Sequence, residues 1–373
     1  MKKANLVALL FAFVLVTVAL APAALAQDIV VTELRIRTPS SGKRGLEALM
    51  VRPNDSQPHP LALMTHGTPR EAKDRAGMTP LRFIPQAREF ARRGWTTVIL
   101  MRRGYGDSGG GYDEDGHVCG RDPDFVGPTK QSVKDLRESA AYLRTRPEVD
   151  PSRMISIGVS TGGLAMVGLS ADPPPGLVAA ISFAGGRGSD VPDHVCHADD
   201  LVQAFGEFGK HSKVPMLWIY AANDHFFGLP LAYRFHRVFT EKGGNALFIA
   251  AAPFGEDGHA LFSLRGIPIW TPTVDDFLKS QNLVLRETLL QISVPAVNPP
   301  SYLSSQGRDE FQTYLLSAPH KAFAASPAKG FGTSTGRRTT EEAKKLALEN
   351  CKKLAPKAEP CTIVMIDDEK PPN

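Results

Sequence analysis

Residues 154–163 read MISIGVSTGG. The apolar residues before Gly158 have the character of a β-strand, and the segment after Gly162 can form a helix. A serine flanked by glycines at minus two and plus two, between a strand and a helix, is typical of a nucleophile elbow, a turn sharp enough to present the serine hydroxyl. Side chains at the two glycines would collide with the neighbouring strand and helix. The stretch therefore predicts Ser160 as a catalytic nucleophile.

A serine nucleophile needs a base, and the base needs a group that orients it. After a nucleophile elbow the expected chain order is serine, then a carboxylate, then histidine. Asp224 follows an apolar run at 216–221, and His259 lies in a glycine-flanked loop after a predicted strand at 246–251. We therefore expect a triad of Ser160, His259 and Asp224.

Other residues near these positions are weaker candidates. His225 adjoins Asp224 in sequence and is badly placed to pair with it, and Glu256 and Asp257 are too close in sequence to His259. His66 ends a short predicted strand, and we expect it to shape a loop rather than to act as the base.

An oxyanion hole needs two N–H donors. The residue directly after the nucleophile, Thr161, should supply one, and Thr68 should supply the other from the loop that begins at His66 and Gly67. The alternative for this loop is a plain tight turn.

Several residues are candidates for a substrate pocket. We expect residues 184–212 to cover the site as a cap. Arg187 in this segment could bind an anionic group, although a solvated loop arginine is the alternative. Four aromatic residues could line an acyl pocket or belong to the core: Tyr105, Trp218, Phe226 and Phe227.

The rest of the chain up to residue 282 predicts an α/β fold. Strands that alternate with helices indicate a mostly parallel sheet with helices on both faces. Strands at 29–37 and 46–51 follow one another without a helix, so the sheet should begin with antiparallel pairing. Further strands are predicted at 61–65, 96–101, 177–183 and 214–221. Helices are predicted at 81–93, at 230–239 and from 273. Another helix should begin after Ser132, which can cap it, with Asp135 in the first turn.

A second, small α+β domain is predicted at 307–373, after a proline-rich linker at 283–306. It has strand-like segments at 321–325, 330–334 and 361–366. A capping box at 339–342 opens its helix. The sequence GTSTG at 332–336 lacks an elbow strand, so Ser334 is not expected to be a nucleophile.

Residues 1–26 have the pattern of a secretory signal peptide, with Lys2 and Lys3, an apolar stretch at 6–20 and small residues at Ala24 and Ala26. Cleavage would leave a hydrolase domain at 27–282. The protein would then be periplasmic or secreted, with no stable membrane insertion. The alternative is that residues 1–26 are retained as a membrane anchor. The net charge of +4 comes without a long basic run, so the sequence gives no case for a nucleic-acid partner.

Four cysteines in an exported protein suggest disulfides. Cys351 and Cys361 lie close together in sequence, which leaves Cys119 to pair with Cys196. A metal cluster is the alternative for the second pair, because each of these cysteines ends a His-Val-Cys tripeptide that begins at His117 or His194. We expect disulfides, and neither a metal nor a cofactor.

The chain resembles the α/β-hydrolase superfamily. Within it, the His66-Gly67 loop, RGYGDSGG at 103–110 and VDPSR at 149–153 resemble the dienelactone hydrolase-like group, over residues 28–282. The resemblance implies an α/β-hydrolase fold and hydrolysis of esters or lactones, and some relatives cleave peptides. Dienelactone hydrolases proper use a cysteine nucleophile, so Ser160 favours general ester hydrolysis. The C-terminal unit is similar to small exported bacterial domains of unknown function, and its partner is not indicated.

The resulting hypothesis is an exported serine hydrolase that cleaves a small-molecule carboxylic ester through an acyl-enzyme. The alternatives are a serine peptidase, a lactone hydrolase or, from another class, a non-catalytic binding protein on a hydrolase scaffold.

Overall fold

The computed structural model describes residues 28–328, 330–355 and 360–371. The expected signal peptide at 1–26 lies outside the described residues. Within the described part of the chain, no helix is both long and apolar enough to cross a membrane.

An eight-stranded sheet forms the centre of the larger unit, in the order β1-β2-β4-β3-β5-β6-β7-β8. The first two strands pair antiparallel, as predicted, and so do β2 and β4, whereas the pairs from β4 through β3 to β8 are parallel. The strands are β1 (Ile29–Ile36), β2 (Leu46–Pro53), β3 (His59–Thr65), β4 (Thr96–Leu100), β5 (Val149–Val159), β6 (Leu177–Phe183), β7 (Met216–Ala221) and β8 (Ala246–Ala251).

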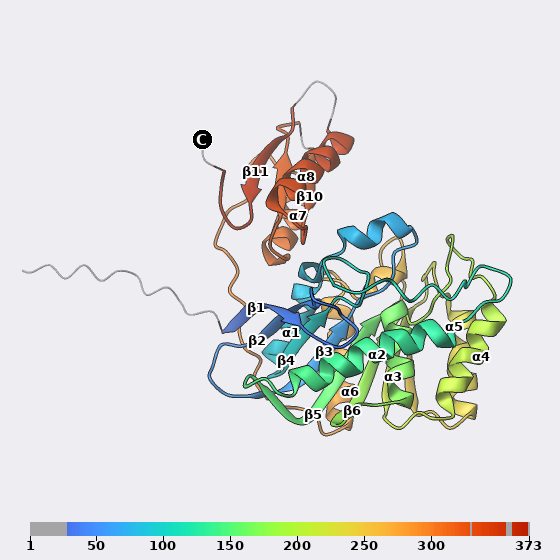
Figure 1. Ribbon diagram of the computed structural model, residues 1–373. Helices are drawn as coiled ribbons and strands as arrows, with labels where there is room; N and C mark the ends of the chain where they lie inside the picture. The colour runs from blue at the N-terminus through green and yellow to red at the C-terminus, as the bar shows by residue number, and fades with distance from the viewer. Residues whose placement is uncertain (1–27, 329, 356–359, 372–373) are drawn as a thin grey trace, which may run out of the picture.

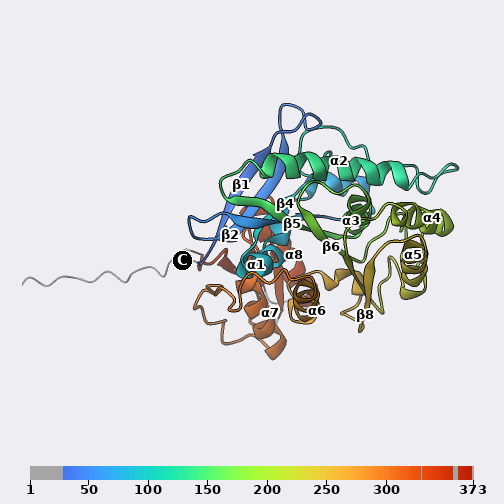
Figure 2. The same ribbon diagram turned by 90° about the horizontal axis from the view of Figure 1, so that it is seen from below.

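Helices cover both faces of this sheet, as the alternating pattern predicted (Figure 2). Helices α1 and α6 pack on one face, and α2, α3, α4 and α5 pack on the other. The helices are α1 (Ile84–Arg92), α2 (Val126–Leu143), α3 (Thr161–Ala171), α4 (Ala198–Gly209), α5 (Leu229–Glu241) and α6 (Ile267–Ser280), and the short 3-10 helices are η1 (Ala72–Gly77), η2 (Pro80–Phe83) and η3 (Gly258–Leu261).

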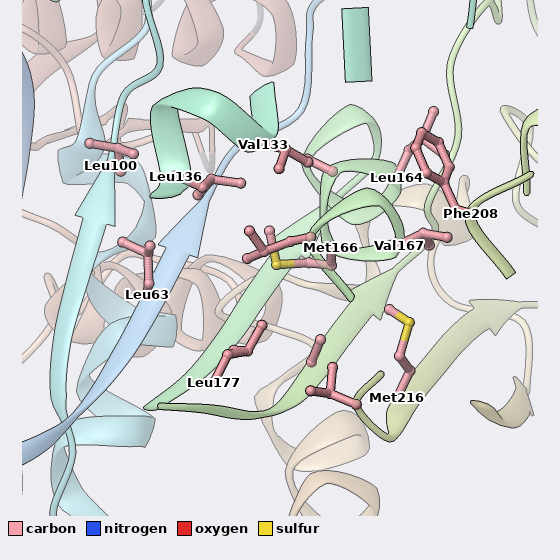
Figure 3. Close-up of a cluster of buried hydrophobic side chains, with 14 of the residues drawn as sticks. Leu63, Leu100, Val133, Leu136, Leu164, Met166, Val167, Leu177, Phe208 and Met216 are labelled. Carbon is pink, nitrogen blue, oxygen red and sulfur yellow. The ribbon is translucent and has the colours of Figure 1, made fainter. Parts of the chain in front are cut away.

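The buried strands divide their apolar side chains between two cores. In β3, Leu61 and Leu63 point into the core beneath α2 and α3, whereas Ala62 and Met64 point into the core beneath α1 and α6. This follows from the two-residue repeat of a strand, which sends successive side chains to opposite faces. Figure 3 shows part of the first core, with Leu63 beside the side chains of α2 and α3. Both faces of the sheet are thus buried, as a parallel sheet requires.

One helix start differs from the prediction. Helix α2 begins at Val126, not after Ser132, because the Asp124 carboxylate accepts the N–H groups of Val126 and Gly127 and so caps the helix. Ser132 lies inside the helix, and its hydroxyl donates to a carbonyl of the preceding turn. Asp135 is buried and pairs with Arg103 at 2.6 Å.

The C-terminal unit contains a three-stranded antiparallel sheet in the order β10-β9-β11. Its elements are α7 (Ser305–Leu316), β9 (Ala322–Ala325), β10 (Phe331–Ser334), α8 (Thr340–Leu354) and β11 (Thr362–Ile366). Phe311 of α7 packs on one face of the sheet, and Ala347 of α8 packs on the other. The predicted cap at Thr339 is confirmed, since its hydroxyl accepts the Glu342 N–H, whereas the Glu342 carboxylate accepts the N–H of Arg338 in place of that of Thr339. The sequence did not reveal α7.

The segment 281–304 between α6 and α7 contains no helix or strand. It lies against the larger unit, where Leu290 and Arg92 exchange hydrogen bonds. Figure 1 shows the C-terminal unit, in orange and red, above one end of the larger unit.

Candidate active site

Ser160 occupies the sharp turn between β5 and α3. Its backbone has φ 58° and ψ −122°, a conformation that a residue with a side chain rarely adopts. A Cβ at Gly158 would lie 2.1 Å from the carbonyl oxygen of Gly162, and a Cβ at Gly162 would lie 2.5 Å from that of His66. The two glycines of the motif are therefore required by packing. Strain on the order of 1–3 kcal/mol persists at such a residue only where the surrounding structure enforces it.

Asp224 and His259 lie at the ends of neighbouring parallel strands and contact each other. The His259 Nδ1 is 3.1 Å from Oδ2 of Asp224 and 3.2 Å from Oδ1. Asp224 also accepts the N–H groups of Phe226 and Phe227 at 2.7 and 2.9 Å. Burial alone would raise the pKa of Asp224, but His259 and these two N–H groups outweigh it and hold the pKa below its ordinary value. The carboxylate is thus kept charged beside the histidine ring.

Three contacts fix the position of His259. The Asp257 carboxylate caps η3 by accepting the His259 N–H at 2.9 Å. The ring of Phe226 stacks on the imidazole at 3.9 Å. The guanidinium of Arg70 lies over the Phe226 ring, 3.5 Å from its centroid, and so supports the imidazole through Phe226. Asp257 therefore holds the backbone of His259, whereas Asp224 contacts Nδ1 of its ring.

Ser160 and His259 line the same cavity, which has a volume of about 1020 Å³. Gly67 also lines it, so close to the serine that a Cβ there would lie 2.7 Å from the Ser160 Cβ. The serine, the histidine and the loop after β3 therefore meet at one edge of the sheet, where ligands of open α/β sheets bind.

The two predicted oxyanion residues are joined through their side chains. The hydroxyls of Thr68 and Thr161 lie 2.8 Å apart, and that of Thr68 lies 2.5 Å from the Tyr105 hydroxyl. Thr161 is the first residue of α3, so its N–H has no acceptor within the helix. The role of the two backbone N–H groups as oxyanion donors stays a prediction.

A buried ion cluster lies beneath this loop, and sequence reasoning did not reveal it. The Glu114 carboxylate accepts from Arg102 at 2.6 Å, from Arg187 at 3.1 Å and from the Tyr105 hydroxyl at 3.0 Å. Arg102 also donates to the Thr161 hydroxyl at 3.2 Å. Burial would raise the pKa of Glu114, but the charges of Arg102 and Arg187 outweigh it and lower the pKa strongly. An acidic residue in a polar loop carries no signal of burial, which is why this partner was missed.

The expected pocket residues divide into one that lines the cavity and four that do not. Phe226 lines it. Tyr105 and Arg187 belong to the buried cluster, Phe227 packs edge-on against His259, and Trp218 lies in the core against Phe205 and Phe239. Arg187 is neither a free ligand for an anion nor a solvated loop residue, because Glu114 already binds it.

The expected cap at 184–212 is also wrong. Within the described residues, no part of this segment lines the cavity. It contains α4, which packs on α5 beside the sheet. The cavity is covered instead by the C-terminal unit, which contributes Glu310, Thr313, Ser317, Ala318, Thr333, Ser334, Thr335, Arg337 and Glu342 to its lining.

The structure contains both predicted disulfides, Cys119–Cys196 and Cys351–Cys361. The sulfurs of the alternative metal cluster are therefore bonded to each other. Its histidines contact carboxylates: His117 faces Asp115, and His194 pairs with Asp190 at 2.5 Å.

Comparisons with known proteins agree with this fold. Residues 89–265 match the model of the Dienelactone hydrolase family. The chain is similar to the acylaminoacyl peptidase of Pyrococcus horikoshii, with a TM-score of 0.50 and 17% identity over 70% of this chain and 43% of that one. It is also similar to esterase 2 of Thermogutta terrifontis, with a TM-score of 0.48 and 15% identity over 69% of this chain and 96% of that one.

One curated relative matches part of the chain. The quorum-quenching protein AidA of Acinetobacter baumannii strain MDR-ZJ06 is 26% identical over 116 residues, which are 31% of this chain and 32% of that protein. The match thus spans about a third of that relative's length.

The sheet order and the serine elbow are those of the α/β-hydrolase fold, and the match to the family model supports a hydrolase. The region 89–265, which carries Ser160, Asp224 and His259, is dienelactone hydrolase-like.

Proposed function

We propose that the protein is an exported serine hydrolase that cleaves carboxylic esters through an acyl-enzyme. The observation that carries this proposal is the strained serine elbow, which opens into the same cavity as a histidine held by a buried carboxylate. A scaffold used only for binding would have no need to hold Ser160 in that conformation. The two disulfides support export, because such bonds persist in oxidising compartments.

In this mechanism His259 takes the proton of the Ser160 hydroxyl while the serine oxygen attacks the ester carbonyl carbon. The carbonyl oxygen becomes an oxyanion, which the N–H groups of Thr161 and Thr68 stabilise. The C–O bond to the alcohol then breaks, and His259 returns the proton to the leaving oxygen. Water repeats the sequence on the acyl-enzyme and releases the acid. Asp224 holds the imidazole with Nε2 free to accept a proton and stabilises the imidazolium that forms.

The buried cluster of Glu114, Arg102 and Arg187 is a positioning device in this proposal. It holds the side chains of Tyr105 and Thr161, and through them the hydroxyl of Thr68. Both arginines pair with the one carboxylate of Glu114, and these ion pairs hold the loops that carry the oxyanion donors before substrate binds.

The first test is hydrolysis of a panel of 4-nitrophenyl esters and peptide amides. We expect ester turnover by the natural protein, and a loss of about 10⁴-fold or more in kcat for Ser160→Ala with an almost unchanged melting temperature. Amide turnover above ester turnover would point to a peptidase instead. Retention of more than a few per cent of esterase activity by Ser160→Ala would contradict the proposal.

A further inference from the structure

The cavity that contains Ser160 is built by both units of the chain. One side comes from the loops after β3 and β8, and the other comes from α7, the turn after β10 and the start of α8. At about 1020 Å³ the cavity leaves room well beyond the ester bond itself. A substrate long enough to fill the cavity would contact the C-terminal unit.

Specific contacts hold the C-terminal unit in this position. Arg338 forms two hydrogen bonds with the Glu47 carboxylate of β2, at 2.7 and 2.8 Å. Glu310 of α7 pairs with Arg265, which follows the histidine loop. These contacts lie on either side of the cavity, so its walls are fixed relative to each other.

Two arginines from the two units meet in the cavity wall. Gly336 packs on the backbone of η2, where an added Cβ would lie 3.0 Å from the Arg82 Cα. The next residue, Arg337, also lines the cavity and donates from Nε to the Ser334 hydroxyl at 2.7 Å. Within the described part of the chain, neither Arg82 nor Arg337 forms an ion pair with a carboxylate. Like charges held together without a counter-ion favour the binding of an anion.

The other charged groups of the cavity leave this pair largely uncompensated. Arg82 remains exposed. Partial removal from water and then the charge of Arg337 lower its pKa, and Glu342 offsets only part of that effect. Glu310 is already paired with Arg265. Lys73 and Arg70 add positive charge to the wall, and Asp74 adds the remaining carboxylate.

We propose that the C-terminal unit forms the second half of the substrate site, and that Arg82 and Arg337 together bind an oxyanion group, a carboxylate or a phosphate, at the far end of the substrate. This inference rests on the proposed function and specifies its substrate class, an ester that carries a negative charge away from the scissile bond. A planar guanidinium can bind such a group through two parallel hydrogen bonds.

Two 4-nitrophenyl esters of matched length test the inference: the neutral pentanoate and the monoester of glutarate, which differs by a terminal carboxylate. We expect the natural protein to prefer the glutarate ester. Arg337→Gln and Arg82→Gln should each lower kcat/KM for that ester about tenfold or more, mainly through KM, because each removes a charge-assisted hydrogen bond. Turnover of the pentanoate should stay within about twofold. Lys352→Gln removes a positive charge from α8 outside the cavity and should change neither ester.

Equal losses on both esters, or no loss on either, would overturn the inference while leaving the esterase proposal intact. Calorimetric binding to Ser160→Ala tests it without turnover and so separates the two proposals. Glutarate or inorganic phosphate should bind Ser160→Ala. Adding Arg337→Gln to this variant should weaken the binding. The ligand that binds more tightly identifies the oxyanion as a carboxylate or a phosphate. Absence of binding by both, or binding that Arg337→Gln leaves unchanged, would contradict it.

Discussion

At the scale of single residues, the site depends on how Asp224 holds His259. The carboxylate has no exposed side-chain surface and accepts two backbone N–H groups besides the ring nitrogen. These contacts fix both its charge and its direction. The same environment makes the residue intolerant of change, because a neutral amide there would present the histidine in the wrong tautomer.

Asp224→Asn should therefore lower kcat by roughly 10⁴-fold while the fold is kept. Steady-state kinetics with a 4-nitrophenyl ester measure the loss, and circular dichroism checks the fold. Glu256→Gln is the matched control, since Glu256 precedes the histidine loop and is exposed; it should be close to the natural protein. A normal rate for Asp224→Asn together with a dead Glu256→Gln would assign the acid to Glu256.

A second residue-scale effect concerns His66, which is buried under the oxyanion loop. Burial, and then the charge of Arg102, lower the pKa of His66 to about 3. The unfolded chain binds a proton at this histidine below about pH 6.5, whereas the folded protein does not do so until about pH 3. The free energy of unfolding should therefore fall as the pH drops through this window, by about 1.4 kcal/mol per pH unit from this group.

Chemical denaturation at several pH values between 4 and 6 checks this. The slope of the unfolding free energy against pH should be smaller by about one proton in His66→Gln, whose side-chain oxygen lies near the position of Nε2 and can accept the Arg102 N–H that this nitrogen accepts at 3.1 Å. The exposed His211→Gln serves as the control and should keep the natural slope. Equal slopes in all three proteins would show that His66 is not held neutral.

At the scale of elements, the Cys119–Cys196 disulfide joins the loop after β4 to the loop after β6. The first loop carries Glu114 and the second carries Arg187, which pair beneath the oxyanion residues. The bond therefore joins the two loops that must stay together for the buried cluster to persist. The Cys351–Cys361 bond lies in the C-terminal unit, at the end of α8 far from the cavity lining at its start.

Cys119→Ser/Cys196→Ser should accordingly lower both the melting temperature and kcat, with a loss of stability of roughly 2–4 kcal/mol. Cys351→Ser/Cys361→Ser should lower the stability of the C-terminal unit and leave kcat largely intact. Thermal unfolding and ester kinetics on both double variants provide the comparison. Full activity in the first variant, or a larger loss of kcat in the second, would contradict this account of the two bonds.

The sequence predicted those elements whose signal is local. The elbow glycines, the strand periods and the capping box at Thr339 each depend on neighbours in the chain, and each has its expected structure. The start of α2 was missed because Asp124 caps it, while Ser132 has an equally cap-like side chain inside the helix. For Trp218 the sequence left both an acyl pocket and the core open, because an aromatic residue on a strand does not reveal which face it occupies.

At the scale of the whole molecule, the sequence brought Ser160, Asp224 and His259 into one hypothesis through their order, and the structure places them at one edge of the sheet. Two features escaped prediction because they depend on contacts between distant segments. One is the ion cluster around Glu114, and the other is the cover over the cavity, which comes from the C-terminal unit and not from residues 184–212. Loop residues that meet only after folding carry no periodic signal, whether they end up buried or exposed.

The most direct test of the central claim is the site of a covalent adduct on the full-length protein. Treatment with a fluorophosphonate followed by intact-mass analysis and peptide mapping should give one adduct per chain, on the peptide that contains Ser160. Ser160→Ala should take up none, and Ser334→Ala, which alters another serine between spaced glycines, should label like the natural protein. Labelling that persists in Ser160→Ala, or an adduct mapped to Ser334, would contradict the assignment of Ser160 as the nucleophile.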